Sequence, residues 1–519
     1  MIVYAFEPVG FEGELVTVEV DLRRGIPSVD LVGLPDGAIK EARERIRAAI
    51  RNSGFEFPLD RLLISLAPAG IRKAGASFDL AMALAILAAS NQIPDPGFPI
   101  LALGELELSG RIRPVSGVLP AVAAGIKAGI SHFVVPRKNI QEARTLASGE
   151  AFAIDVLSDA NRLTALLRGD PGNGDRLLDC DQSAIESAGQ CSSLIDAEDM
   201  ADIRGQPGLR RAMEVAAAGG HHLLLFGPPG VGKTMAARRL VGLLPDLDGD
   251  DAITATMLHS LAGELPELSG LLHRPPFRAP HHGASAEGIV GGGKSRKPGE
   301  ISLAHGGVLL LDEAPEFRSD VLQSLREPLE DGRISIARAD RVTSYPSRFL
   351  LVLACNPCPC GNLGRQGAVC LCSRDEIRHY WKRLGGPLLD RIDIRVPVRP
   401  SSPGELASGP GESSAAIRQR ILTARHMQAE RYSGRPYRLN GRLPANGIDA
   451  YCVMSTEARS VFVMKAERSG YSSRACHSAL RVARTIADLA GSTQLTEAHI
   501  DEAFDLRRYG AEDVFWLIP

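Results

Sequence analysis

The sequence predicts an α/β protein, and two patterns carry this prediction. Residues 196–400 alternate apolar strand-like runs with helical runs, as a parallel sheet covered by helices requires. Residues 1–165 also alternate short strand-like runs with helical ones, separated by turn signals, which indicates a first α/β domain. Between them, residues 166–195 are rich in Gly, Asp and Ser and indicate a linker. Residues 401–519 begin with a flexible Ser/Gly/Pro-rich segment and are then mostly helical, which predicts a helical lid.

The composition is that of an ordinary globular protein. The chain has 519 residues, of which 44% are hydrophobic and 23% are charged, and this length suggests two to four domains. Its formal charge is −3, from 59 Lys and Arg against 62 Asp and Glu. Because the whole chain is not basic, a polyanionic partner would have to be held by a local patch of cations.

The same residues give an expectation about location. The first 20 residues carry no basic region followed by an apolar run, so we expect no secretory signal. The longest apolar stretch, LAMALAILAA (80–89), is too short to span a bilayer and is better interpreted as a buried helix. Nine cysteines are too few for a disulfide scaffold. We therefore expect a cytoplasmic protein with no membrane contact.

A glycine-rich loop stands in the context that phosphate binding requires. The apolar strand HLLLF (222–226) precedes it and the helical run KTMAARRLVGLL (233–244) follows it. Its glycines let backbone N–H groups turn toward the β-phosphate, Lys233 can reach the β- and γ-phosphates, and Thr234 can bind Mg²⁺. We predict that ATP binds here with Mg²⁺, held by Gly227, Pro228, Pro229, Gly230, Val231, Gly232, Lys233 and Thr234.

Two later strands end in polar residues suited to hydrolysis. The run GGVLLLDEAPEF (306–317) is an apolar strand ending in Asp312 and Glu313. Asp312 would hold the Mg²⁺ shell and Glu313 would polarise the attacking water, although such an acidic pair can also be a solvated loop. The run RFLLVLACNP (348–357) ends in Asn356, which can orient the same water as a sensor. An ordinary Asn-Pro turn is the alternative.

Three arginines and one glutamine are further candidates. Arg391, in GPLLDRIDIRV, is either a surface cation or a group that reaches the γ-phosphate of a neighbouring subunit, and we favour the second. Arg474 and Arg481 lie on one face of a predicted helix. We expect Arg474 to act as a second sensor that closes over the nucleotide, and structural salt bridges are the alternative for both. Gln206, which follows Gly205, is expected beside the adenine.

These motifs, in this order, resemble a known family. The wordings FRAPHH, PGEISLAHGGVLLLDE and GPLLDRID are similar to the magnesium-chelatase-like branch of the AAA+ ATPases. The N-terminal runs VGLPDGAIKEARERIRAAI and LAPAGIRKAGASFDLAMALAILAAS resemble the Lon-protease-like domain, with its ribosomal S5-like fold, that begins the ComM/YifB proteins. The resemblance implies a hexameric ring that drives DNA branch migration in natural transformation and homologous recombination, with recombination proteins as partners.

The resemblance also allows peptidase chemistry to be judged. Lon-type proteases activate a serine with a lysine, and Ser77 stands where the resemblance expects the nucleophile. The expected lysine position falls on Leu119, and a hydroxyl without a base is a poor nucleophile. Lys73 is not the expected partner. We therefore expect an inactive domain that packs on the ring or binds a partner, in which Ser77 caps a helix.

Two basic segments are candidates for DNA contact. The insert EGIVGGGKSRKPGE (287–300) combines three consecutive glycines with cations. The run EDGRISIARADRVTSYPSRF (330–349) predicts a β-hairpin that presents Arg338 and Arg341, with Arg333 as a further candidate. Both resemble pore-lining elements of this AAA+ branch, and ordinary charged loops are the alternative. Contacts to phosphates would be independent of DNA sequence. The candidate DNA-binding residues are Lys294, Arg296, Lys297, Arg338 and Arg341.

A cysteine cluster follows the sensor asparagine. The pairs Cys358 with Cys360 and Cys370 with Cys372 can form a tetrahedral zinc site, and reduced or redox-labile thiols are the alternatives. We expect the preceding Cys355 to pack in the core. The adjacent histidines in RAPHHGAS (278–285) are expected to point apart and to make a loop contact in the ring rather than bind a metal.

The leading hypothesis is thus an ATP-driven DNA motor. An alternative from another class is a chelatase-type or chaperone-type ATPase that remodels a partner protein, which would share every nucleotide residue but would not need the basic loops. An ATP-dependent protease is the third reading, and it depends on a base for Ser77.

Overall fold

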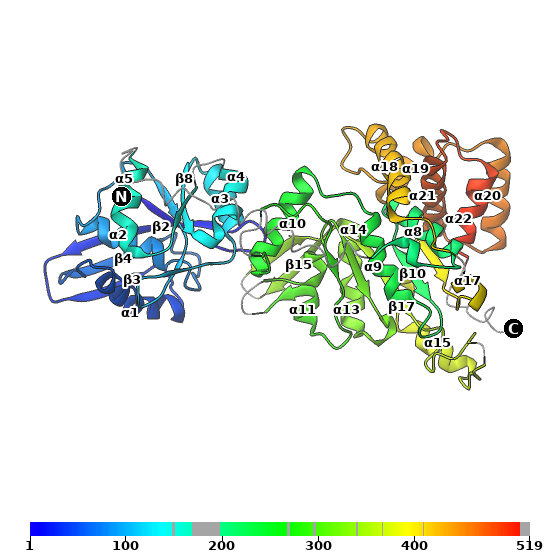
Figure 1. Cartoon of the computed structure of the whole chain (residues 1–519), viewed down its shortest axis with the longest axis horizontal. Helices are drawn as coiled ribbons and strands as arrows, with labels where there is room; N and C mark the ends of the chain where they lie inside the picture. The colour runs from blue at the N-terminus through cyan, green and yellow to red at the C-terminus, as the bar shows by residue number, and fades with distance from the viewer. Residues whose placement is uncertain are drawn as a thin grey trace.

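The computed structural model describes residues 1–147, 151–168, 198–266, 270–293, 297–338, 341–365, 367–407 and 409–508. Figure 1 shows an N-terminal α/β domain at one end, a second α/β unit in the middle and a group of helices at the other end. The predicted α/β class is confirmed.

The N-terminal domain is built on a mixed seven-stranded sheet. The strand order is β3-β4-β2-β1-β5-β8-β9, in which β2 pairs antiparallel with β1 and β4 and the remaining pairs are parallel. Helix α2 (Asp79–Ala89) is buried along nearly its whole length, because its residues are apolar on every side. The strands are β1 (Val3–Glu7), β2 (Glu14–Arg23), β3 (Ser28–Val32), β4 (Arg61–Ala67), β5 (Ile100–Ala102), β8 (His132–Pro136) and β9 (Ala151–Ile154), with a small hairpin of β6 (Glu105–Leu106) and β7 (Ile112–Arg113). The other helices are α1 (Gly37–Asn52), α3 (Val118–Lys127), α4 (Ile140–Ala147) and α5 (Ala160–Leu167).

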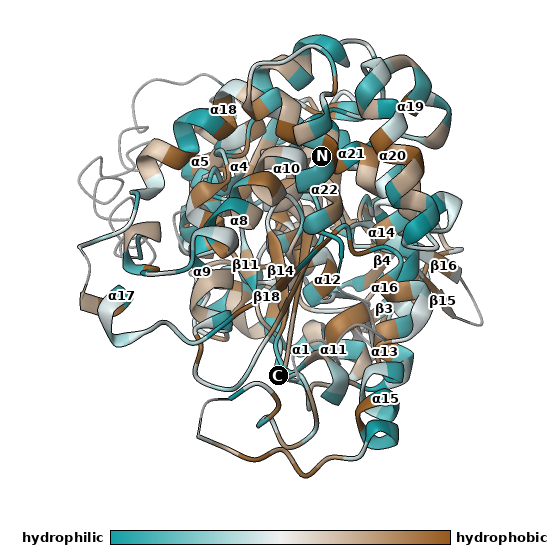
Figure 2. Cartoon of the chain, turned by 90° about the vertical axis from the view of Figure 1, so that its right-hand side faces the viewer, coloured by the Kyte–Doolittle hydropathy of each residue, from teal (hydrophilic) through white to brown (hydrophobic). Residues whose placement is uncertain are grey.

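The middle unit contains the parallel sheet that the sequence predicts. Its order is β11-β14-β17-β10-β18, and every pair is parallel. The strands are β10 (Leu223–Phe226), β11 (Phe277–Arg278), β14 (Val308–Leu311), β17 (Leu350–Cys355) and β18 (Ile394–Pro397). Strands β10, β14 and β17 are buried at every residue, as expected for a sheet covered on both faces. Figure 2 shows hydrophobic strands β11, β14 and β18 in the middle, surrounded by helices with hydrophilic outer faces.

Helices and a hairpin surround this sheet. The predicted hairpin forms from β15 (Arg333–Arg338) and β16 (Arg341–Pro346), with Arg338 opposite Arg341. The glycine-rich insert contributes the short ladder of β12 (Gly291–Gly292) and β13 (Lys297–Pro298). The helices are α8 (Pro207–Gly219), α9 (Lys233–Leu243), α10 (Gly249–Ala262), α11 (Ala286–Val290), α12 (Glu300–Leu303), α13 (Ser319–Ser324), α14 (Arg326–Asp331), α15 (Arg374–Lys382) and α16 (Gly386–Leu389).

The C-terminal part is helical, as predicted, and two boundaries differ. The lid consists of α18 (Ser414–Arg431), α19 (Ala445–Tyr451), α20 (Thr456–Arg468), α21 (Ser473–Leu489) and α22 (Glu497–Asp505). A short helix, α17 (Pro403–Ala407), lies in the segment expected to be flexible. Helix α5 continues to Leu167, beyond the expected domain boundary at 165, and most of the expected linker (169–195) lies outside the described residues.

The N-terminal domain contacts the middle unit through α3 and α10. The backbone N–H of Gly117 donates to the carbonyl of Ser260 at 3.0 Å. The carboxylate of Glu142 accepts the Ser260 hydroxyl and, at 2.8 Å, the N–H of Leu119. Burial raises the pKa of Glu142. The N-terminal domain therefore packs on the middle unit of its own chain. Within the described part of the chain, no helix has the length and apolar character to cross a membrane.

Candidate ATP site

The phosphate loop lies between β10 and α9, where the sequence places it. Lys233 Nζ is buried and donates to the carbonyls of Gly227 at 2.6 Å and Pro228 at 2.9 Å, and to Asn356 Oδ1 at 3.1 Å. Burial lowers the pKa of Lys233. The backbone at Gly227 packs closely against that of Val398: a Cβ at Gly227 would lie 2.1 Å from the carbonyl oxygen of Val398, so this position has no room for a side chain. The predicted lysine and sensor asparagine are thus brought into direct contact at the carboxyl edge of the sheet.

The two residues predicted to hold Mg²⁺ also meet. Thr234 Oγ1 donates to Asp312 Oδ2 at 2.5 Å, and the other oxygen of Asp312 accepts the N–H of Glu313 at 2.9 Å. A hydroxyl and a carboxylate side by side are oxygen ligands of the kind that Mg²⁺ prefers, so these residues fit the ion. Glu313 has a left-handed backbone, with φ of 52°, which turns it out of the end of β14.

The sequence analysis did not predict that a histidine lies beside Glu313. His282 Nδ1 lies 3.4 Å from Glu313 Oε2. The ring centroids of His281 and His282 are only 4.1 Å apart, so the expectation that the two side chains point apart is wrong. The alternation of a strand does not apply, because both residues follow the short strand β11 in a loop. Gln206, expected at the adenine, donates to the carbonyl of Val231 in the phosphate loop at 3.4 Å.

Arg391 lies at the opposite edge of the sheet from the phosphate loop. It precedes β18, which runs parallel to β10, whereas the phosphate loop follows β10. The carboxylate of Glu330 accepts Arg391 Nη2 and, at 2.5 Å, Arg474 Nη2. The hydrogen bond from Arg474, together with the charge of Arg391, lowers the pKa of Glu330.

Arg474, expected to act as a second sensor, lies beside Arg391. Because both side chains pair with Glu330, Arg474 stands on the side of the sheet opposite the phosphate loop. Arg481, on the same helix, lines a cavity together with Arg391 and Arg474, and its buried Nε has no hydrogen-bond partner among the described residues. Nothing in the sequence near Glu330 indicated that one carboxylate would bind both arginines.

The candidate DNA-binding residues are described only in part. Lys294 and Arg296 lie outside the described residues, as do the side chains of Arg338 and Arg341. Lys297 is exposed, and its Nζ donates to the carbonyl of Ala262 at 2.9 Å.

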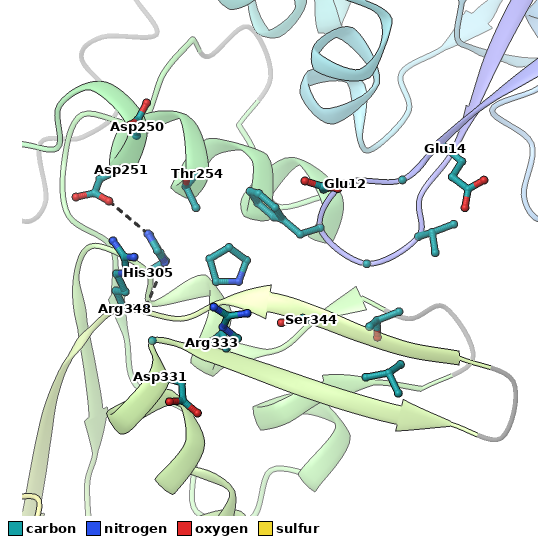
Figure 3. Close-up of a pocket in the computed structure, with 18 residues that line it drawn as sticks. Glu12, Glu14, Asp250, Asp251, Thr254, His305, Asp331, Arg333, Ser344 and Arg348 are labelled. Carbon is teal, nitrogen blue, oxygen red and sulfur yellow. Dashed lines mark hydrogen bonds and ion pairs between the residues drawn. The ribbon is translucent and has the colours of Figure 1, made fainter. Parts of the chain in front are cut away.

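The base of the hairpin faces the N-terminal domain. A cavity of ≈ 680 Å³ separates the loop of residues 9–14 from the hairpin and α10. Figure 3 shows Glu12 and Glu14 on the first domain, opposite Arg333 and Ser344 of the hairpin. Asp251 and His305 form an ion pair at 3.7 Å on the far side of this cavity. Arg333, a further candidate for DNA contact on this hairpin, therefore lines an interdomain cavity.

The four predicted zinc ligands lie together. The ligand atoms of Cys358, Cys360, Cys370 and Cys372 are all within 4.8 Å of one another. Cys355, at the end of β17, is buried in the core as expected.

Two positions bear on whether Ser77 has a peptidase base. Leu119, at the position of the expected lysine, is fully buried. Lys73 is also buried, and its ammonium donates to the carbonyls of Pro68 and, at 2.8 Å, Gly33. The expectation that Ser77 caps a helix is wrong, because α2 begins after Phe78 and has no side-chain cap.

Three family models match this chain, and the one over its middle unit spans the phosphate loop, the acidic pair and the sensor. "Magnesium chelatase, subunit ChlI" matches residues 199–406, "Subunit ChlI of Mg-chelatase" matches residues 18–139, and "Magnesium chelatase, subunit ChlI C-terminal" matches residues 411–507. Full-length relatives settle the assignment. Competence protein ComM of Haemophilus influenzae is 40% identical over 510 residues, covering 98% of this chain and 97% of the relative. The chain belongs to the magnesium-chelatase-like AAA+ ATPases of the ComM/YifB group.

Other relatives agree with this family. An uncharacterized protein of Mycobacterium tuberculosis is 43% identical over 504 residues, covering 97% of each chain. Uncharacterized protein YifB of Escherichia coli is 39% identical over 511 residues, covering 98% of this chain and 96% of the relative. The N-terminal region is Lon-like: a Lon protease of Geobacter metallireducens is 32% identical over 142 residues, 26% of this chain and 17% of the relative. The magnesium-chelatase-like AAA+ family implies ATP and Mg²⁺ as ligands of the site described above.

Proposed function

We propose that this protein is a ring-forming, ATP-driven DNA motor that catalyses branch migration during natural transformation and homologous recombination. The observation that carries the ring is the placement of Arg391 and the phosphate loop on opposite edges of one sheet. Such a chain presents the phosphate loop on one side and Arg391 on the other, so each side carries half of a hydrolytic site. Head-to-tail contacts between these two sides close into a ring, for which we propose six subunits. The DNA substrate is supported by similarity to the relative named Competence protein ComM and by the basic hairpin.

In the proposed site, each residue has one task at a stated atom. In the structure, Lys233 Nζ donates hydrogen bonds to two backbone carbonyls and to Asn356. When ATP binds, this ammonium group turns to the β- and γ-phosphates. Thr234 and Asp312 hold Mg²⁺, which neutralises developing phosphate charge when it is bound. Glu313 accepts a proton from the attacking water, and Asn356 orients that water.

A neighbouring subunit completes the site. Its Arg391 stabilises charge on the transferred phosphate, and its Arg474 enters beside that arginine, because Glu330 already holds the two side chains together. Hydrolysis then depends on contact between subunits. The hairpin and the insert at 287–300 would move as ATP is hydrolysed and would act on DNA phosphates, without sequence preference.

DNA-stimulated ATP hydrolysis tests the proposal. The wild-type rate is measured with and without branched DNA, alongside gel shifts at low salt with a non-hydrolysable ATP analogue. Reversing three charges together, Lys294→Glu, Arg338→Glu and Arg341→Glu, should weaken DNA binding at least tenfold and flatten its salt dependence. A matched control is Arg23→Glu, an exposed residue of the N-terminal domain that pairs with Asp21.

Two results would contradict the DNA assignment. One is a wild-type ATPase rate that does not respond to DNA, and the other is normal binding and remodelling of branched DNA by the triple variant. Either result would favour an ATPase that remodels a partner protein, because that activity uses the same nucleotide residues without the basic loops.

A further inference from the structure

The four clustered cysteines have the spacing of a metal site. Cys358 Sγ lies 3.4 Å from Cys360 Sγ and 3.6 Å from Cys370 Sγ, and the last two are 3.7 Å apart. A disulfide would bring two sulfurs to about 2.05 Å. Four thiolates around one Zn²⁺, at about 2.3 Å each, place the sulfurs about 3.8 Å from one another by tetrahedral geometry. The observed separations therefore fit a shared metal and not a pair of disulfides.

The surrounding structure holds the two cysteine pairs in place. Cys358 and Cys360 follow β17 through Asn356 and Pro357, and Trp381 of α15 donates its indole N–H to the Pro357 carbonyl at 3.1 Å. Trp381 is buried and packs edge-to-face on Phe226, with ring centroids 5.8 Å apart. The second pair comes immediately before α15, which begins with a capping box at Ser373.

We propose that Cys358, Cys360, Cys370 and Cys372 bind one structural Zn²⁺. Thiolates are soft ligands that favour Zn²⁺ over the hard cations of the ATP site. Four protein ligands fill a tetrahedral shell, which leaves no open position for a substrate and distinguishes a structural site from a catalytic one. The cluster ranges from the buried Cys358 to the exposed Cys360, so the ion can enter from solvent.

The metal would also stabilise the ATP site. Cys358 is two residues from Asn356, which binds Lys233. Gly361, inside the cysteine loop, lies against the phosphate loop, since a Cβ there would be 3.1 Å from Pro229 Cδ. Loss of the metal should therefore loosen both the sensor and the phosphate loop. This consequence rests on the ATP site proposed above, whereas metal binding itself does not.

Metal analysis of the full-length chain tests the proposal. Protein purified under reducing conditions without chelator should contain about one Zn²⁺ per chain by atomic spectroscopy. The double variant Cys370→Ser with Cys372→Ser should contain less than about a tenth of that amount. The control Cys476→Ser, on α21 outside the cluster, should keep the full amount. If the double variant does not fold, replacement of Zn²⁺ by Co²⁺ in the wild-type chain decides, because thiolate-to-cobalt bands and tetrahedral d–d bands should appear.

Three results would overturn this assignment. They are native protein with unmodified, freely reactive thiols and no bound metal, a cysteine-linked peptide from the cluster in non-reduced digests, and iron in place of zinc. ATP binding provides a separate measurement. A zinc-loaded chain that fails to bind ATP would contradict the nucleotide site and leave the metal site standing. A double variant that loses zinc but binds and hydrolyses ATP normally would refute the coupling between them.

Discussion

Two inactive variants, Lys233→Ala and Arg391→Ala, should restore ATP hydrolysis when they are mixed. Strand β18 is four residues long and pairs in parallel with β10, so the edges of the sheet are about 13 Å apart at 3.3 Å per residue. Arg391 precedes that span and the phosphate loop follows it, which puts the γ-phosphate of its own chain beyond the reach of the guanidinium. The proposed role of Arg391 therefore requires a neighbouring chain.

The expected size of each effect follows from this geometry. Removing an arginine that stabilises phosphoryl transfer typically costs 10³-fold or more in rate, or about 4 kcal/mol, so Arg391→Ala alone should be almost inactive. In rings assembled at random from equal amounts of the two variants, an interface works when an intact phosphate loop meets an intact arginine. One half multiplied by one half predicts about a quarter of the wild-type number of working interfaces.

The assay is steady-state release of phosphate at fixed total protein, with the ratio of the variants varied. The rate should be maximal at equal amounts, near a quarter of the wild-type rate if interfaces act independently. Arg418→Ala, which removes an arginine of the lid helix α18 that pairs with Asp246, is the matched control and should keep the full rate. A mixture no faster than the sum of its parts, despite proven co-assembly, would refute action across the interface.

Three further predictions address the site and the domain contact. Glu313→Gln should bind ATP normally in an equilibrium assay but lose hydrolysis, because the amide cannot accept the proton of water; normal turnover would remove Glu313 from the mechanism. Gly227→Ala should lose ATP binding, because the added Cβ would lie 2.1 Å from the Val398 carbonyl oxygen. The control Gly208→Ala places its Cβ where no atom lies within 4 Å, so this variant should bind ATP and have a melting temperature no lower than that of the wild type. Burial raises the pKa of Glu142 above its ordinary value of 4.5, so the folded chain holds a proton that the unfolded chain has released. The free energy of the first unfolding transition should therefore fall as pH rises from 4.5 through the raised value, and Glu142→Gln should remove that slope; an unchanged slope in this variant would contradict the assignment to Glu142.

Local motifs predicted which residues of the candidate ATP site lie together, because each of these motifs follows a strand of the same parallel sheet. Lys233 and Asn356 each follow a parallel strand, and parallel strands bring such ends to one edge. The contact between Glu330 and Arg474 joins residues 144 positions apart, and no local pattern encodes such a pairing. Ser77 was wrongly assigned as a helix cap, because capping rules state which residue types are preferred before a helix and do not show at which residue the helix begins.

The shared carboxylate of Glu330 has a consequence for a chain that is not part of a ring. Two guanidinium groups so close to each other would repel if nothing lay between them, and Glu330 supplies the intervening negative charge. In the proposed ring, the γ-phosphate of a neighbouring subunit's ATP would replace the Glu330 carboxylate as the anion between the two arginines. A subunit outside the ring would keep both guanidinium groups paired with Glu330.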